Sequence, residues 1–250
     1  MFTGSMTALV TPFRAGEVDR RALGALVDRQ IDAGTHALVP CGSTGEAATL
    51  THDEHVEVVR EVVRVARGRV PVIAGTGSNS TAEATRLPII VYNIPARTSS
   101  NMTPETIGRL SRIGNIIGVK EASGSLAQVL EIIEASGPDF AVYSGDDILT
   151  LPIMAVGGKG VIAVTANLVP REFAELAETL LAGDLDRSRG LMHRLLPLVH
   201  AMSLEVNPIP VKTALAMMGQ CAEEFRLPLT CASSGTRTKL ETVLREYELV

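Results

Sequence analysis

The stretch Ile116-Ile-Gly-Val-Lys-Glu-Ala-Ser-Gly124 decides the predicted fold and also carries the first candidate for catalysis. Residues 115–119 form a short, mostly apolar run that Ser123 and Gly124 end, which is typical of a strand covered on both faces in a parallel sheet. Lys120 stands at the end of this strand. Burial there would favour the neutral amine, which can attack a carbonyl to form a Schiff base. The alternative is a lysine whose stem packs while its charged end reaches water.

The other three lysines are weaker candidates for such a nucleophile. Lys159 lies in the glycine-rich stretch 157–160, where we expect solvent around it. Lys212 follows Pro208-Ile-Pro210 at a predicted helix start, and Lys239 falls on the polar side of a C-terminal helical pattern. Neither of the last two positions gives a reason to lose a proton. Lys120 is therefore the candidate nucleophile.

Short apolar runs alternate with helical patterns over the first two thirds of the chain. The predicted strands are 6–10, 37–40, 70–74, 88–92, 116–120, 140–143 and 160–164, and the predicted helices between them are 19–33, 52–66, 104–113 and 126–135. This alternation predicts an α/β fold of parallel βα units, and reactive residues at the carboxyl ends of strands favour a (β/α)8 TIM barrel over a doubly wound sheet.

The pattern becomes purely helical after Pro170, with predicted helices over 171–181, 185–202, 210–218 and 238–249. We therefore expect a TIM-barrel catalytic core over residues 1–169. Residues 170–250 are expected to form the final barrel helix and a C-terminal helical extension.

The predicted barrel lacks about one βα unit after Thr85. A strand of about six residues spans roughly 20 Å, so the returning helix needs about 13 residues as well as two loops. Only about eleven residues separate Gly75 from Leu87, and the sequence shows no eighth strand. Either the unit is deleted or the sequence omits it, and an intact mass near 26.5 kDa would show that the polypeptide is this short.

Composition points to a small-molecule enzyme in the cytoplasm. A net charge of −5 without a basic cluster argues against nucleic acid or an anionic membrane as partner. Cys41, Cys221 and Cys231 are too scattered for a disulfide framework or a zinc site, so we expect neither a metal nor a cofactor. The first arginine is Arg14 and no apolar run approaches 18 residues, which predicts neither a signal peptide nor a membrane span.

Four short motifs each have a functional and a structural interpretation. Gly42-Ser-Thr-Gly-Glu46 could cradle a small carboxylate or form a plain βα turn. Gly75-Thr-Gly-Ser-Asn-Ser80 lacks the third glycine of a dinucleotide fingerprint and predicts a turn. His52-Asp-Glu-His55 does not match a zinc motif and predicts a helix start. Asp146-Asp147 could hold a divalent metal, but we interpret it as a helix cap.

Tyr92 and Arg97 are more specific candidates. A tyrosine at a strand end can relay a proton, and an arginine five residues later can pair with the carboxylate of a substrate. Tyr92 could instead be a half-buried packing residue.

Five motifs, in order and spread over nearly the whole chain, resemble the dihydrodipicolinate synthase family of pyruvate-dependent class I aldolases. They are Gly42-Ser-Thr-Gly-Glu-Ala-Ala-Thr-Leu50, Ala74-Gly-Thr-Gly-Ser-Asn-Ser-Thr-Ala-Glu83, Tyr92-Asn-Ile-Pro-Ala-Arg-Thr98, Gly118-Val-Lys-Glu-Ala-Ser-Gly124 and Asn207-Pro-Ile-Pro-Val-Lys212. The resemblance implies condensation of pyruvate with L-aspartate 4-semialdehyde in the diaminopimelate and lysine pathway.

The same resemblance implies roles for individual residues. Lys120 would form the Schiff base, Tyr92 would shuttle protons and Ser43 would take the place of the relay hydroxyl, which is usually threonine. Residues implied in substrate binding are Thr44 for the pyruvate carboxylate, Arg97 for the semialdehyde carboxylate, and the backbone carbonyls of Gly145 and Ile162 in the pocket wall. A lysine-inhibitor site is implied at Ala47, Ala48, His52, His55, Asn79 and Glu83.

The sequence departs from the family at the shortened segment. Family members carry there a βα unit whose loop bears two tyrosines, one of which reaches into a neighbouring subunit of a homotetramer built as a dimer of dimers. This chain has only Tyr92, Tyr143 and Tyr247, none of them in that context.

Two other functions fit parts of the pattern. One is a related pyruvate lyase, such as an N-acetylneuraminate lyase, and the other is an inactive barrel paralogue, which the shortened segment would explain. Arg97 favours a short acidic aldehyde over a long polyol acid, because lyases for the latter tend to have an uncharged residue there.

Overall fold

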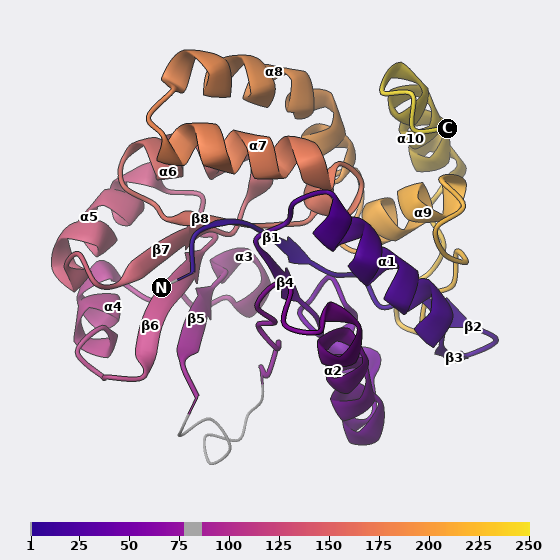
Figure 1. Ribbon diagram of the computed structural model, residues 1–250, viewed down its shortest axis with the longest axis horizontal. Helices are drawn as coiled ribbons and strands as arrows, with labels where there is room; N and C mark the ends of the chain where they lie inside the picture. Colours follow the sequence, from indigo (N-terminus) through magenta and orange to yellow (C-terminus); the bar gives the residue numbers. More distant parts are fainter. Residues whose placement is uncertain (1, 78–86) are drawn as a thin grey trace.

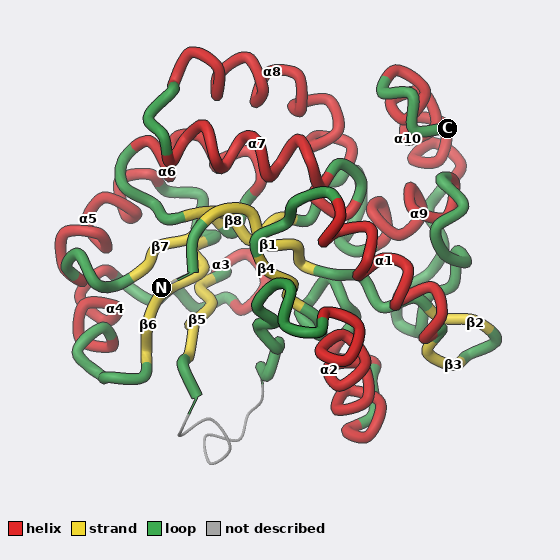
Figure 2. Tube along the Cα trace, viewed as in Figure 1, coloured by secondary structure: helices red, strands yellow, loops and turns green. Residues whose placement is uncertain are grey.

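Six parallel strands form one curved sheet in the computed structural model, which describes residues 2–77 and 87–250. The strand order across the sheet is β4-β1-β8-β7-β6-β5. These strands are β1 (Gly4–Ala8), β4 (Ala37–Val39), β5 (Ile89–Asn93), β6 (Ile116–Glu121), β7 (Ala141–Ser144) and β8 (Gly160–Ala163). Figure 2 shows them following a curved line, with β4 and β5 at its two ends.

The predicted run 70–74 does not form a full strand. It makes a single parallel bridge, between Val72 and Leu38 of β4, so it continues the sheet by one position beyond β4. Six of the seven predicted strands are therefore confirmed, and the seventh is reduced to a bridge among the described residues. A short hairpin of β2 (Phe13–Arg14) and β3 (Glu17–Val18) was not predicted, because runs of two residues carry no periodicity.

Helices cover the outer face of the sheet (Figure 1). Those between strands are α1 (Arg20–Asp32), α2 (His52–Ala66), α3 (Pro95–Thr98), α4 (Pro104–Leu110), α5 (Leu126–Ser136) and α6 (Thr150–Ala155), with short 3-10 turns η1 (Ala47–Thr49), η2 (Asp147–Leu149) and η3 (Thr165–Asn167). The C-terminal helices are α7 (Pro170–Leu181), α8 (Leu185–Ala201), α9 (Ile209–Met217) and α10 (Ser234–Glu246). Every helix that the sequence predicts is confirmed, whereas the short helices α3 and α6 were missed.

Local side-chain chemistry explains where several helices begin. The Thr51 hydroxyl accepts from the Glu54 N–H and the Glu54 carboxylate accepts from the Thr51 N–H, so α2 starts with a capping box. Asp19 caps α1 and Ser125 caps α5 in the simpler way, through one side-chain acceptor each. The interpretation of residues 52–55 as a helix start is thereby confirmed.

Apolar side chains form separate clusters on the two faces of the sheet. Outside, α1 and α2 pack around Leu38, α4 and α5 around Val119, and α7 lies between β1 and α8. Inside, a smaller cluster contains Met6, Ala8, Ala37, Ala141, Tyr143 and Ile162. Among the described residues, no helix is both long and apolar enough to cross a membrane.

Candidate active site

Strand register places Lys120 between two tyrosines on the inner face of the sheet. Lys120 pairs with Tyr92 of β5 on one side and with Tyr143 of β7 on the other. Because paired residues of parallel strands point to the same face, the three side chains lie side by side. The Lys120 Nζ atom is 4.5 Å from the centroid of the Tyr92 ring. The Tyr143 hydroxyl donates to the Phe2 carbonyl at 2.8 Å, so its proton is already engaged.

The amine of Lys120 is partly buried, and this burial lowers its pKa to about 8. The Asp147 carboxylate opposes the shift, and the Arg97 guanidinium adds to it. With such a pKa, about a tenth of the lysines are neutral at pH 7, whereas an ordinary lysine is almost wholly charged. The prediction that burial favours a neutral amine at Lys120 is therefore supported by its surroundings.

The two aspartates after β7 differ in their surroundings: Asp146 caps the following 3-10 turn, and Asp147 is buried. The Asp146 carboxylate accepts from the Ile148 N–H at 3.3 Å, which is the predicted cap. Asp147 is 7% exposed and its carboxylate accepts from the N–H groups of Val164 at 3.1 Å and Thr165 at 2.6 Å. The cap interpretation is thus wrong for Asp147, because its side chain reaches across to the end of β8 and places a carboxylate near Lys120.

Gly145 and Ile162 lie beside the same inner face. A Cβ atom at Gly145 would stand 3.1 Å from Lys120 Cγ and 2.8 Å from Ala122 Cβ, so any larger residue would push against the Lys120 stem. Ile162 is 3% exposed and belongs to the inner apolar cluster. Their location agrees with a place in the pocket wall, while the implied role of their carbonyls stays a prediction.

The loop after β4 carries Ser43 and Thr44. It is a tight turn, in which the N–H groups of Gly45 and Glu46 donate to the carbonyls of Gly42 at 3.0 Å and Ser43 at 3.2 Å. Thr44 is buried, and its hydroxyl oxygen accepts from the Asn207 side-chain amide at 3.0 Å, which leaves the hydroxyl proton free to donate. Ser43 is exposed, and in the described contacts its hydroxyl reaches neither Lys120 nor Tyr92.

Arg97 lies on the short helix α3, directly after β5, and is exposed. Its charge acts on both Lys120 and Tyr92, which places its guanidinium at the same end of the sheet. A positive group there is suited to hold the carboxylate of a second substrate close to the amine.

Lys212 corrects the expectation that its position gives no reason to lose a proton. Its side chain is 0% exposed, and its Nζ atom lies 2.6 Å from the Glu46 carboxylate, which is also 0% exposed. Burial lowers the pKa of Lys212 and Glu46 opposes this shift. The helix start was correctly predicted, but α9 is buried on several sides at Ile209, Val211 and Ala214. That apolar run was the available signal for a buried lysine.

The four described residues of the implied lysine-inhibitor site lie around the start of α2. Ala47 is partly buried, Ala48 and His52 are exposed, and the His55 Nε2 atom lies 2.7 Å from the Gly75 carbonyl. Asn79 and Glu83 lie outside the described residues, as does the end of the stretch 75–80 that predicts a turn. Within residues 2–77 and 87–250, no group of His, Cys, Asp and Glu side chains is arranged to hold a metal.

Comparison with known proteins decides the family. The sequence profile described as the dihydrodipicolinate synthetase family matches residues 1–87 and 82–247. The chain belongs to this family. A relative from Geobacter sulfurreducens named 4-hydroxy-tetrahydrodipicolinate synthase is 46% identical, and one of the same name from Trichlorobacter lovleyi is 45% identical, each over the full length of both chains.

Solved structures of this family superpose closely on the chain. Dihydrodipicolinate synthase from Aquifex aeolicus is 42% identical, with a TM-score of 0.97 and 99% of each chain covered. The chloride-inhibited synthase from Acinetobacter baumannii, complexed with pyruvate, is 35% identical, with a TM-score of 0.97 and 100% of each chain covered. Among the described residues, the parallel α/β sheet with its covering helices is therefore the arrangement of this family.

The comparisons also show that the chain is shorter than its relatives. The alignments extend over 290 positions, whereas the chain has 250 residues, so about 40 positions have no counterpart here. The family profile matches in two pieces whose ends meet at residues 82–87. This is the place where the sequence predicted the absence of about one βα unit.

Proposed function

We propose that this chain condenses pyruvate with L-aspartate 4-semialdehyde, the 4-hydroxy-tetrahydrodipicolinate synthase reaction of diaminopimelate and lysine biosynthesis. The chemistry begins at Lys120, whose neutral amine attacks the C2 carbonyl of pyruvate. Loss of water gives an iminium, and loss of a C3 proton gives the enamine. The enamine carbon then attacks the aldehyde of the second substrate, and cyclisation releases Lys120.

The surrounding residues bind and move protons in this proposal. Thr44 and the backbone of its loop hold the pyruvate carboxylate through hydrogen bonds, and the free proton of the Thr44 hydroxyl suits this role. Tyr92, whose ring is 4.5 Å from the Lys120 amine, transfers protons during formation of the iminium. Resemblance to the family assigns Ser43 as its partner hydroxyl, although the two side chains are not in contact in the described structure. Gly145 and Ile162 complete the wall of the pocket.

The observation that carries the proposal is a partly buried lysine with a pKa of about 8 between Tyr92 and Tyr143. Borohydride reduction in the presence of pyruvate tests it, because a reduced Schiff base adds a stable mass to one lysine. We expect peptide mapping to place this mass on the peptide with Lys120. Mass on the peptide with Lys212 instead, or on no lysine, would contradict the proposal. Trapping also distinguishes an enzyme from an inactive paralogue.

Arg97→Met should separate the binding of the two substrates. Without the guanidinium, we expect the KM for the semialdehyde to rise roughly 10–100-fold, the loss expected for a charge-assisted pair, while the half-saturating pyruvate concentration stays the same. Because Arg97 lowers the pKa of Lys120, the pH at which the trapping rate levels off should also move upward from about 8. Steady-state kinetics and trapping rates between pH 6 and 10 measure both effects. An unchanged semialdehyde KM would remove Arg97 from the site and favour the lyase alternative.

We propose that the curved sheet belongs to a (β/α)8 barrel from which about one βα unit is missing after Thr85. Its support is the position of the open side, since β5 and the bridge at Val72 are the two ends of the described sheet. In this proposal residues 1–169 form the barrel core, and residues 170–250 form the last barrel helix and the C-terminal extension.

Feedback inhibition by L-lysine is a further part of the proposal. The synthase from Cyanidioschyzon merolae, 34% identical, was solved with lysine bound. In this chain the ligand would lie near Ala47, Ala48, His52 and His55, with Asn79 and Glu83. We expect L-lysine titration to inhibit turnover, and full activity at millimolar lysine would count against the site.

For assembly and location we propose a cytoplasmic homotetramer arranged as a dimer of dimers. Family tetramers support this, although one matched structure, 36% identical, is described as a monomeric synthase variant. Sedimentation velocity would distinguish the two states.

A further inference from the structure

The loop with Ser43 and Thr44 is held from the C-terminal part of the chain by a buried ion pair. Glu46 has a left-handed backbone, with φ of 53°, at the end of this turn, and its side chain points inward. One carboxylate oxygen lies 2.6 Å from the Lys212 Nζ atom on α9. The other accepts from the Arg226 N–H at 3.3 Å. Both oxygens of Glu46 are therefore fixed by residues more than 160 positions later in the sequence.

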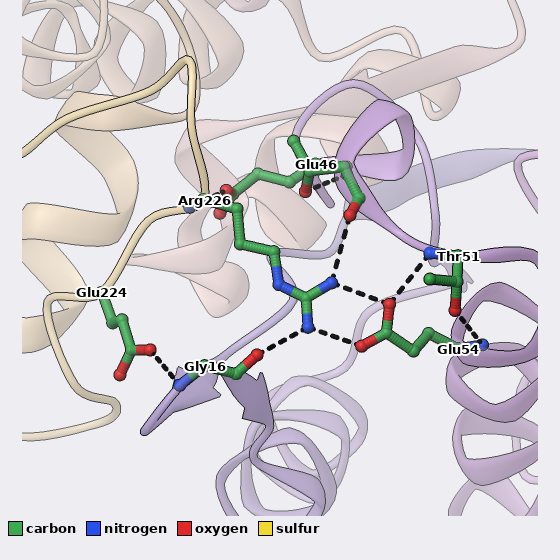
Figure 3. A network of polar contacts seen from close by, with 7 residues as sticks. Gly16, Glu46, Thr51, Glu54, Glu224 and Arg226 are labelled. Carbon is green, nitrogen blue, oxygen red and sulfur yellow. Dashed lines mark hydrogen bonds and ion pairs between the residues drawn. The ribbon is translucent and has the colours of Figure 1, made fainter.

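An aromatic ring and a second ion pair surround this contact. Phe13 lies between two cations, with the Lys212 Nζ atom 4.1 Å and the Arg226 Cζ atom 4.3 Å from its ring centroid. Figure 3 shows the Arg226 guanidinium between the Glu54 carboxylate and the Gly16 carbonyl, and the same group donates to the Thr49 carbonyl at 3.1 Å. The loop is thus held at Glu46 and at Thr49 by the same C-terminal segment.

Stability is a weak explanation for this arrangement. Removing two charges from water is costly, and apolar residues of similar size often stabilise a core equally well. What a buried, hydrogen-bonded ion pair provides is a defined geometry, because the carboxylate cannot shift without losing its partners. Thr44 stands two residues before Glu46 within the same turn, and its hydroxyl is held by Asn207 at 3.0 Å. The position of Thr44 therefore depends on the position of Glu46.

We propose that Lys212 is a positioning residue that fixes the pyruvate-binding loop through Glu46. The inference rests on the proposed function, because it assigns the loop to the pyruvate carboxylate. Lys212 does not react with the substrate: its ammonium holds Glu46 in place, and Glu46 holds the turn in which Thr44 binds the keto acid. The groups that shift the pKa of Lys120 are Asp147 and Arg97, so loss of Lys212 should change binding and leave the titration of the nucleophile unaltered.

Removing both charges together tests this role. The single variants Lys212→Met and Glu46→Gln leave one charge buried without its partner, so both should lower the Tm. The double variants Lys212→Met/Glu46→Gln and Lys212→Gln/Glu46→Gln leave no unpaired charge and should recover most of that Tm. In both double variants we expect the half-saturating pyruvate concentration for borohydride trapping to rise roughly tenfold, as for one weakened charge-assisted hydrogen bond. The pH dependence of trapping should match that of the unaltered chain.

Arg237→Met is the matched control, because it removes the ion pair of Arg237 with Glu223 in the same C-terminal region without touching the loop. It should leave the half-saturating pyruvate concentration unchanged. A folded double variant with unaltered half-saturation would overturn the inference, and so would a failure of both double variants to fold, since the pair would then serve folding. Absence of trapping in the unaltered chain would refute the proposed function itself.

Discussion

Lys120→Ala is expected to abolish borohydride trapping of pyruvate and to lower turnover by about 10⁴-fold or more, the scale of effect seen when a covalent nucleophile is removed. The reason is geometric as well as chemical. Lys120 lies on the inner face of the sheet, with the Tyr92 ring 4.5 Å from its amine, and burial has brought its pKa to about 8. The Lys212 amine, which is also buried, is engaged in the ion pair 2.6 Å from Glu46, so we do not expect it to replace Lys120.

Three measurements complete this prediction. Circular dichroism should show Lys120→Ala folded, because the alanine leaves a small space on a face that is only partly buried. Lys239→Ala, on the exposed side of α10, should keep full trapping and serves as the control for removal of a lysine. In the unaltered chain the rate of trapping should rise about tenfold per pH unit below pH 8 and level off above it. Residual pyruvate-dependent mass in Lys120→Ala would show that the nucleophile lies elsewhere.

The part of the site that could be predicted from sequence is the part encoded locally. Lys120 was predicted because an apolar β-branched run ends on it, and Tyr92 because it ends another such run. Strands of a parallel sheet bring their carboxyl ends together, so the neighbouring position of the two follows from the fold class alone. The start of α2 is also determined by neighbouring residues, since Thr51 and Glu54 form a capping box within four residues.

Long-range partners could not be predicted in this way. The Lys212–Glu46 pair joins residues 166 positions apart, and only the packing of α9 against the loop after β4 brings them together. Asp147 was assigned to a cap because Ser144-Gly-Asp-Asp147 suits one, yet its carboxylate accepts from Val164 and Thr165 on the next strand unit. In both cases the sequence analysis named the residue but could not identify its partner, because the partner lies far away in the sequence or on another strand unit.

Restoring a βα unit after Thr85 is expected to raise both the Tm and the turnover of this chain. The described sheet ends at β5 on one side and at the Val72 bridge on the other, whereas a closed barrel has no unpaired strand edge. Insertion of the corresponding segment of about 40 residues from the Geobacter sulfurreducens relative, 46% identical, would supply the missing unit. We expect it to raise the Tm by roughly 5 °C, equivalent to about 2 kcal/mol at this chain length.

The same insertion should raise turnover by roughly 10²-fold, the lower end of what a positioned acid–base group contributes. By resemblance to the family, the inserted loop carries the tyrosine pair that completes the proton relay with Tyr92 across a subunit contact. A Gly/Ser linker of equal length at the same position is the matched control, because it lengthens the chain without adding a strand or a tyrosine. This linker should raise neither the Tm nor the turnover. If graft and linker behave alike, the open side of the sheet is not what limits this chain.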